Sequence, residues 1–206
     1  MSVGVAEEKL LTKAVAYANS WEHLSDELLC LDLRLRLQIL KQRRSQTSDP
    51  LSPFRGLVVT DTEVSDLLQT PVAAAASLAG SVERQKIDQE LTAIQNQILE
   101  RRVASRQAGG YLSLPRLVEL FGLTRFEEQC LVICLAPEVD RKYEKLYAYI
   151  QDDATRRRAG VDLVLNLLCR NDEEKLAAAF HRSGCLPLAA ILCGGVEEER
   201  HRAANP

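Results

Sequence analysis

The 206-residue chain carries 26 Lys and Arg residues against 29 Asp and Glu residues, which gives a net charge of −3. An acidic balance of this kind excludes a basic field over the whole domain, so any contact with nucleic-acid phosphates would have to be local. Hydrophobic residues make up 46% of the chain but aromatic residues only 5%, and this composition, rich in Leu and Ala, predicts a mostly all-α fold.

The N-terminus and the apolar runs bear on localisation. The first residues, MSVGVAEEKLL, carry acids where a signal peptide would carry basic residues. The longest apolar runs, such as Val161 to Cys169, contain polar residues and fall short of the about 20 residues that cross a bilayer. The sequence therefore predicts a cytoplasmic protein that makes no membrane contact.

The stretch Leu29 to Ile39, LCLDLRLRLQI, fits two patterns. Apolar and polar residues alternate in it as in a half-buried strand, but other spacings fit one face of a helix. We predict a helix because Leu, Arg and Gln are good helix formers and β-branched residues are scarce. A loop with two prolines is predicted to follow at residues 45–56. The helical stripe consists of Leu24, Leu28, Leu31, Leu35 and Ile39.

Helix starts are predicted at three capping boxes, in which a Thr or Asn side chain stands three residues before a Glu. The Ncap side chain and the carboxylate can then each accept a hydrogen bond from the other residue's backbone N–H. Apolar residues follow each box, as expected for amphipathic helices. The three pairs are Thr60 with Glu63, Thr124 with Glu127, and Asn171 with Glu174.

An Ala-rich connector at residues 70–81 precedes a predicted long helix at residues 82–105. Gly109 and Gly110 are predicted to close this helix. The chain is therefore expected to divide into a helical N-terminal region, residues 1–108, and a compact module, residues 109–206. The apolar stripe of the long helix consists of Ile87, Leu91, Ile94 and Ile98.

Two further helices are expected in the second half. Pro137 is predicted to end one helix and to lie in the first turn of the next. The run from Val161 to Cys169 is apolar almost all round, which predicts a helix buried on most sides at the centre of the C-terminal core. The buried face of the helix that begins at Pro137 is predicted to consist of Val139, Tyr143, Leu146, Tyr147 and Ile150.

Motifs for catalysis are absent from the sequence. It contains no GxxxxGK[ST], HExxH or GxSxG and no glycine-rich dinucleotide fingerprint. Its histidines, at positions 23, 181 and 201, stand beside no nucleophile, and a single histidine on a helix is usually structural or solvent-facing. We therefore expect no catalytic residue, no cofactor and no enzymatic activity.

The six cysteines form no CxxC pair, and most of them lie inside apolar runs. They are predicted to be reduced, buried thiols. A zinc site is the alternative, because Cys130 and Cys134 stand one helical turn apart and Cys185 follows His181 by four residues. Zinc ligands usually come in tighter knuckles, so no metal is predicted.

A polar cluster interrupts the apolar segments between Leu146 and Leu168. Asp152 and Asp153 are predicted to end a helix and open a turn, with a metal site or an acid/base pair as the alternative. The next arginines are predicted to lie on a solvated turn paired with nearby acids, with an anion- or partner-binding edge as the alternative. The candidate partner- or phosphate-binding residues are Arg141, Lys142, Lys145, Arg156, Arg157 and Arg158.

The segment Leu114 to Cys169, which includes the strings FGLTRFEE and LYAYIQDDATRRR, resembles the N-terminal winged-helix region that precedes the ATPase module in bacterial AAA-family ATPases. Some of these ATPases are encoded with phage-tail-like contractile injection systems. The upstream segments Leu31 to Ile39 and Asp49 to Leu68 are similar to the leading segments of the same family.

The resemblance implies a winged-helix-like domain at residues 109–206 with at most a small β wing. It also implies a non-catalytic interaction or adaptor module that binds a protein partner, a substrate or an ATPase module. ATP binding does not carry over, because the chain contains no Walker motif. A DNA-binding regulator is the alternative, which is disfavoured because the helix from Val161 offers only Asn166 and Asp162 toward base edges.

Overall fold

The computed structural model describes residues 15–46, 68 and 79–180. None of these residues forms a strand, and the predicted mostly all-α fold is confirmed. The helices are α1 (Ser20–Gln46), α3 (Ala79–Gln107), α4 (Ser113–Phe121), α5 (Arg125–Val139), α6 (Lys142–Ile150), α7 (Val161–Leu168) and α8 (Asp172–Phe180).

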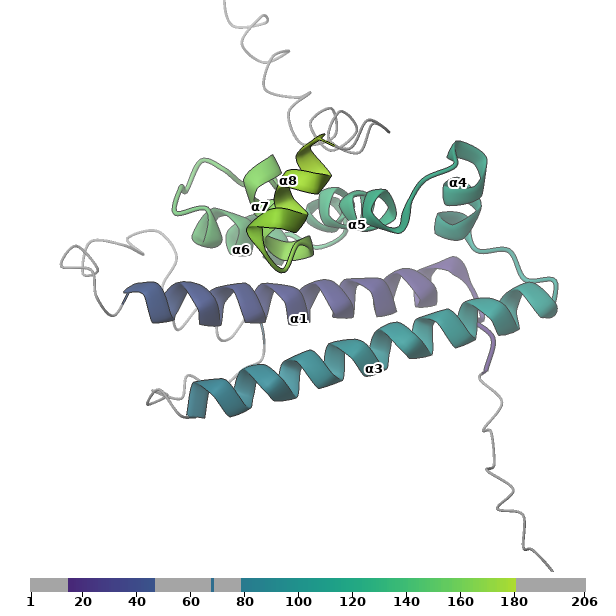
Figure 1. The fold of residues 1–206 in the computed structure, drawn as a ribbon. Helices are drawn as coiled ribbons and strands as arrows, with labels where there is room; N and C mark the ends of the chain where they lie inside the picture. The colour runs from purple at the N-terminus through teal and green to yellow at the C-terminus, as the bar shows by residue number, and fades with distance from the viewer. Residues whose placement is uncertain (1–14, 47–67, 69–78, 181–206) are drawn as a thin grey trace, which may run out of the picture.

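Helix α1 is the central element. It lies beside α3, which runs in the opposite direction, and the short helices α5, α6 and α7 cover its other side (Figure 1). The helix predicted for Leu29 to Ile39 is therefore confirmed as part of α1. Because α1 reaches Gln46 and α3 begins at Ala79, the edges of the predicted loop 45–56 and connector 70–81 belong to helices. The remaining parts of those two segments lie outside the described residues.

Burial on two sides of α1 explains its strand-like alternation. Leu31 and Leu35 belong to the hydrophobic cluster shared with α5, α6 and α7, whereas Leu33 is equally buried but outside that cluster. Side chains two positions apart on a helix point about 200° apart, so Leu33 faces the α3 side. A helix packed between two layers produces the same alternation as a half-buried strand.

The main core joins α1 to the short helices. The predicted α1 stripe is buried from Leu28 to Ile39, and Leu24 packs against it. Four residues of the face predicted for the next helix, Tyr143, Leu146, Tyr147 and Ile150, are buried on α6. The fifth, Val139, belongs to α5 and is partly buried against the same cluster. Helix α7, predicted to be buried on most sides, places Leu163, Val164 and Leu167 in the buried cluster, and of its other residues only Asp162 is exposed. The division of the chain at residue 108 stays a prediction.

Capping geometry follows the sequence closely. The Glu127 carboxylate accepts a 2.7 Å hydrogen bond from the Thr124 N–H, and the Glu127 N–H donates to Thr124 Oγ1 at 3.3 Å. At the start of α8, the Glu174 N–H donates to Asn171 Oδ1 at 2.8 Å. The Glu174 carboxylate, however, accepts from the backbone N–H of Arg170, the residue before Asn171. The box predicted at residues 60–63 lies outside the described residues.

Glycines end α3 as predicted. Gly109 has a φ of +72°, a conformation that glycine adopts at no steric cost. The Gly110 N–H donates to the Ser105 carbonyl at 2.8 Å, which satisfies a carbonyl of the last helical turn.

Pro137 does not begin a new helix, and this prediction is wrong. Helix α5 continues through Pro137 to Val139, and α6 begins only at Lys142. A proline inside a helix has no N–H to give to the carbonyl four residues earlier. Here the Tyr147 hydroxyl donates to that carbonyl, on Ile133, at 2.7 Å. A side chain from α6 thus replaces the missing backbone hydrogen bond.

Replacing Tyr147 with Phe is expected to lower the free energy of unfolding by about 1–3 kcal/mol, because the buried Ile133 carbonyl loses its hydroxyl donor. In a Pro137→Ala background, residue 137 supplies a backbone N–H, and the same substitution should cost clearly less. Urea unfolding of the four proteins in this double-mutant cycle measures the coupling. Equal costs in both backgrounds would contradict the proposed replacement.

Candidate interaction surfaces

The acid pair ends α6 and opens a turn, as predicted. Asp152 adopts a left-handed φ of +53°, and the Asp153 N–H donates to the Ala148 carbonyl at 3.1 Å. Asp153 Oδ1 accepts hydrogen bonds from the Thr155 hydroxyl and N–H at 2.6 and 2.9 Å. These hydrogen bonds from Thr155 lower the pKa of the Asp153 carboxyl. The Asp153 carboxylate is therefore engaged within the turn itself.

One side chain organises the loop that follows. The Gln151 amide nitrogen donates to the carbonyls of Arg156 and Arg158 at 3.1 and 2.9 Å. The Gln151 amide oxygen accepts from the Gly160 N–H at 3.0 Å. These bonds hold the arginine carbonyls toward Gln151, and the arginine side chains are 50–71% exposed.

Each arginine of this turn is paired with a carboxylate, so the prediction of a solvated turn paired with nearby acids is confirmed. Exposed pairs of this kind are worth at most about 1 kcal/mol each, but they compensate the charge that would attract a phosphate. The pairs are Arg156 with Asp153 at 3.4 Å, Arg157 with Glu144 at 3.8 Å, and Arg158 with Glu138 at 2.8 Å.

The basic candidates in α6 and directly before it divide into two groups. Lys142 is only 23% exposed, and its Nζ lies 2.8 Å from Asp32 Oδ2 and 4.9 Å from the centre of the Tyr143 ring. It therefore ties α6 to α1. Arg141 and Lys145 are exposed, and contact of the six basic candidates with a partner or a phosphate stays a prediction.

Helix α7 offers little to the DNA grooves. The Asn166 side chain, its best candidate for reading a base edge, donates to Asp162 Oδ2 at 3.0 Å. This bond holds the amide against a carboxylate of the same helix, which would face DNA phosphates with like charge.

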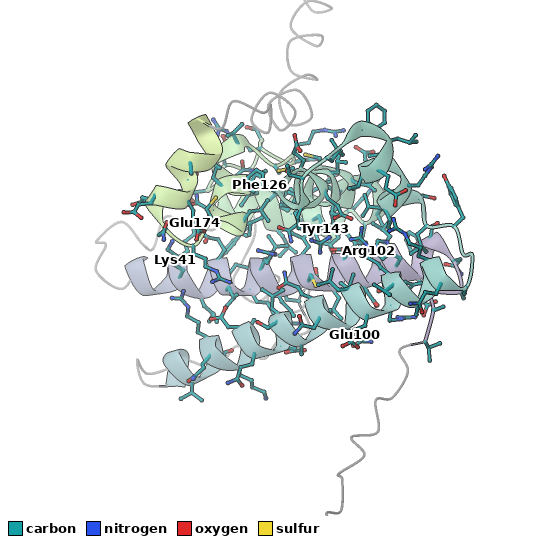
Figure 2. The ribbon with its side chains drawn as sticks, turned by 45° about the vertical axis from the view of Figure 1, so that its right-hand side comes forward. Lys41, Glu100, Arg102, Phe126, Tyr143 and Glu174 are labelled. Atoms are coloured by element: carbon teal, nitrogen blue, oxygen red, sulfur yellow. The ribbon has the colours of Figure 1, made fainter. Side chains whose placement is uncertain are left out.

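A buried ionic cluster, which sequence reasoning missed, joins α1, α3 and α5. Figure 2 labels one of its members, Arg102 on α3. The Arg125 guanidinium lies 3.0 Å from Glu27 and 2.7 Å from Glu128. Arg102 approaches Glu128 to 3.0 Å. Both carboxylates are buried. The cluster therefore joins three helices through ion pairs whose acidic groups are removed from water.

His23 lies next to this cluster and is fully buried. Its ring packs edge-on against Tyr17, with 5.0 Å between ring centres, and its Nε2 lies 3.8 Å from Glu27. Burial, followed by the charge of Arg102, lowers the pKa of His23 to about 4. This histidine is structural, in agreement with the expectation for a single histidine on a helix.

The start of α1, the end of α3 and the whole of α4 lie at the same end of the molecule (Figure 1). No residue of α4 is buried, although its sequence is amphipathic. The side chains of Tyr111, Leu117, Leu120 and Phe121, which we call the α4 surface, are exposed. Other exposed apolar side chains near this end are Val15, Trp21, Leu99 and Val103.

Other classes of site find little support in the described part of the chain. No three His, Cys, Asp or Glu side chains are grouped there as metal ligands, and no helix there is long and apolar enough to cross a membrane. Cys30 and Cys130 are buried, and burial raises the pKa of the Cys30 thiol to about 12. An open hollow of about 20 Å³ beside Cys30 and Arg34 has room for little more than a water molecule.

These features define a helical module with ion pairs between its helices and exposed apolar side chains at one end. A family model described as "Winged helix domain, variant" matches residues 6–192, and the chain belongs to this family. No match is found among curated proteins or solved structures. Winged helix domains are generally non-catalytic modules for protein or DNA contacts.

Proposed function

We propose that this chain is a non-catalytic interaction module that docks a protein partner or substrate for an AAA-type ATPase. The resemblance of Leu114 to Cys169 to the region that precedes such ATPase modules supports the ATPase context. A protein as the ligand is supported by one observation above all: the α4 surface exposes large apolar side chains. Exposed apolar patches typically mark protein contacts.

The charge distribution favours a protein over DNA. The arginines at residues 156–158 are each paired with a carboxylate, and Lys142 is engaged with Asp32. A DNA-binding surface would instead leave such cations available to several phosphates, whose neutralisation supplies most of the non-specific affinity.

The test of the ATPase context starts from the genome. An AAA module encoded in frame with this chain, or in a neighbouring gene, is purified and titrated with the chain in a calorimeter. A stoichiometric complex supports the proposal. The absence of any neighbouring P-loop gene, or of heat on mixing with its product, would overturn the ATPase part of the proposal.

A DNA-binding regulator is the second candidate, because three arginine side chains on one turn are exposed. We expect no anisotropy change when the chain is added to labelled duplex DNA at about 50 mM salt, since compensated arginines release few counterions. The matched control replaces Arg156, Arg157 and Arg158 with Ala. Binding that falls steeply with salt and disappears in the control would establish the regulator instead.

A further inference from the structure

We infer that the α4 surface binds an amphipathic helix of a partner protein, one whose apolar stripe is flanked by acidic residues. The inference rests on the proposed function, because it names the surface and the kind of partner. The surface consists of Tyr111, Leu117, Leu120 and Phe121, of which Tyr111 and Phe121 are 70% and 72% exposed.

The apolar stripe of helix α4 is partly covered at the first turn and exposed beyond it. Leu114 is partly buried and packs against the main core, while the Ser113 hydroxyl and N–H each lie 3.0 Å from Ser20 Oγ on α1. Gly122, with a φ of +62°, ends the helix. The helix is therefore anchored at its first turn, and its second half carries the exposed apolar residues.

The spacing of those residues suits another helix. Leu117, Leu120 and Phe121 stand three and four positions apart, so they share one face. Partner helices are recognised through apolar anchors at this same spacing. The nine residues of α4 extend about 14 Å, which is enough to face two to three turns of a partner.

Positive charge beside the α4 surface favours a partner helix with acidic residues next to its apolar stripe. Arg106 and Arg116 both pair with one carboxylate, that of Glu119, and their side chains are 78% and 51% exposed. Two cations sharing one anion leave an excess positive charge next to the apolar stripe. Acidic flanks complement it, whereas a second copy of this chain would bring the same two arginines against each other.

Two labelled helical peptides of 18 residues test the inference. They share one Leu and Phe stripe, but one carries Glu and the other Lys beside the stripe. The Glu peptide is expected to bind at least about tenfold more tightly. Leu120→Ser and Phe121→Ser should each weaken its binding about tenfold or more, with an unchanged urea midpoint because both side chains are exposed.

Val82→Ser is the matched control, because Val82 is also an exposed apolar residue but lies at the start of α3, at the opposite end of that helix. It should bind the Glu peptide as the parent does. Arg116→Glu should reverse the preference between the two peptides. Equal binding of both peptides by the parent, or binding that Phe121→Ser does not change, would overturn the inference.

Other occupants give distinct results. Sedimentation that shows a dimer abolished by Phe121→Ser, without peptide binding, would assign the surface to a second copy and overturn the inference. Binding to phosphatidylserine vesicles that competes with the peptide would assign it to a lipid surface and also overturn it. If the ATPase module binds Phe121→Ser as tightly as the parent, the inference fails while the proposed function stands. If the Glu peptide binds but no complex with an ATPase module forms, the inference stands and the ATPase part of the proposed function fails.

Discussion

Replacing Glu128 with Ala is expected to lower the free energy of unfolding by about 3 kcal/mol. Glu128 is almost fully buried, and its carboxylate neutralises both Arg102 and Arg125, at 3.0 and 2.7 Å. Its removal takes away the carboxylate that pairs with Arg102, leaves Arg125 paired with Glu27, and opens space between α3 and α5. Urea unfolding followed by circular dichroism measures the loss.

Glu119 provides a matched control, because its carboxylate is also shared between two arginines but is 43% exposed. Glu119→Ala should cost less than about 1 kcal/mol, since exposed ion pairs are weak. Glu128→Gln keeps the side-chain shape and should fall between the two. If Glu128→Ala costs no more than Glu119→Ala, the buried cluster does not hold the three helices together.

The helices were predictable because the signals that define them are local. The capping box of Thr124 and Glu127, the leucine stripe of α1 and the buried face of α6 each depend on residues within one or two turns of one another. The sequence also predicted the turn at residues 151–158, where Arg156 pairs with Asp153 three residues earlier, although Arg157 and Arg158 pair with more distant acids.

The fate of Pro137 was not predictable by the same rules. Proline usually interrupts a helix because the carbonyl four residues earlier loses its hydrogen-bond donor. The helix can continue where another group donates to that carbonyl. The Tyr147 hydroxyl does so from the next helix, and its position depends on how α6 packs against α5. Local propensity is therefore overridden by a tertiary contact.

The buried ionic cluster and the α4 surface escaped prediction for opposite reasons. A charged residue on a helix is usually solvated, so Glu27 and Glu128 resemble ordinary surface residues until α1, α3 and α5 come together. An apolar stripe usually faces a core, so nothing local distinguishes the exposed stripe around Leu120 from a buried one. Both depend on contacts between segments far apart in the chain.

Acidification is expected to destabilise the protein through His23, by about 3 kcal/mol between about pH 7 and pH 4. In the folded chain the pKa of His23 is lowered from 6.5 to about 4, first by burial and then by the charge of Arg102. Between these two values the unfolded chain binds a proton at this residue and the folded chain does not. The stability contribution is therefore fully present above pH 6.5 and is lost as the pH falls toward 4.

The groups around His23 explain why protonation is resisted. Burial contributes most to the lowered pKa, and the charges of Arg102 on α3 and Arg125 on α5 add to it, outweighing the favourable charges of Glu128 and Asp26. His23→Leu removes the titrating group from the buried site and serves as the control, because the remaining carboxylates still titrate in it. The free energy of unfolding should fall more steeply with acid in the parent than in His23→Leu, by about 3 kcal/mol over this range. Parallel pH profiles would show that the histidine is protonated in the folded state, and the cluster of α1, α3 and α5 would then have to accommodate its charge.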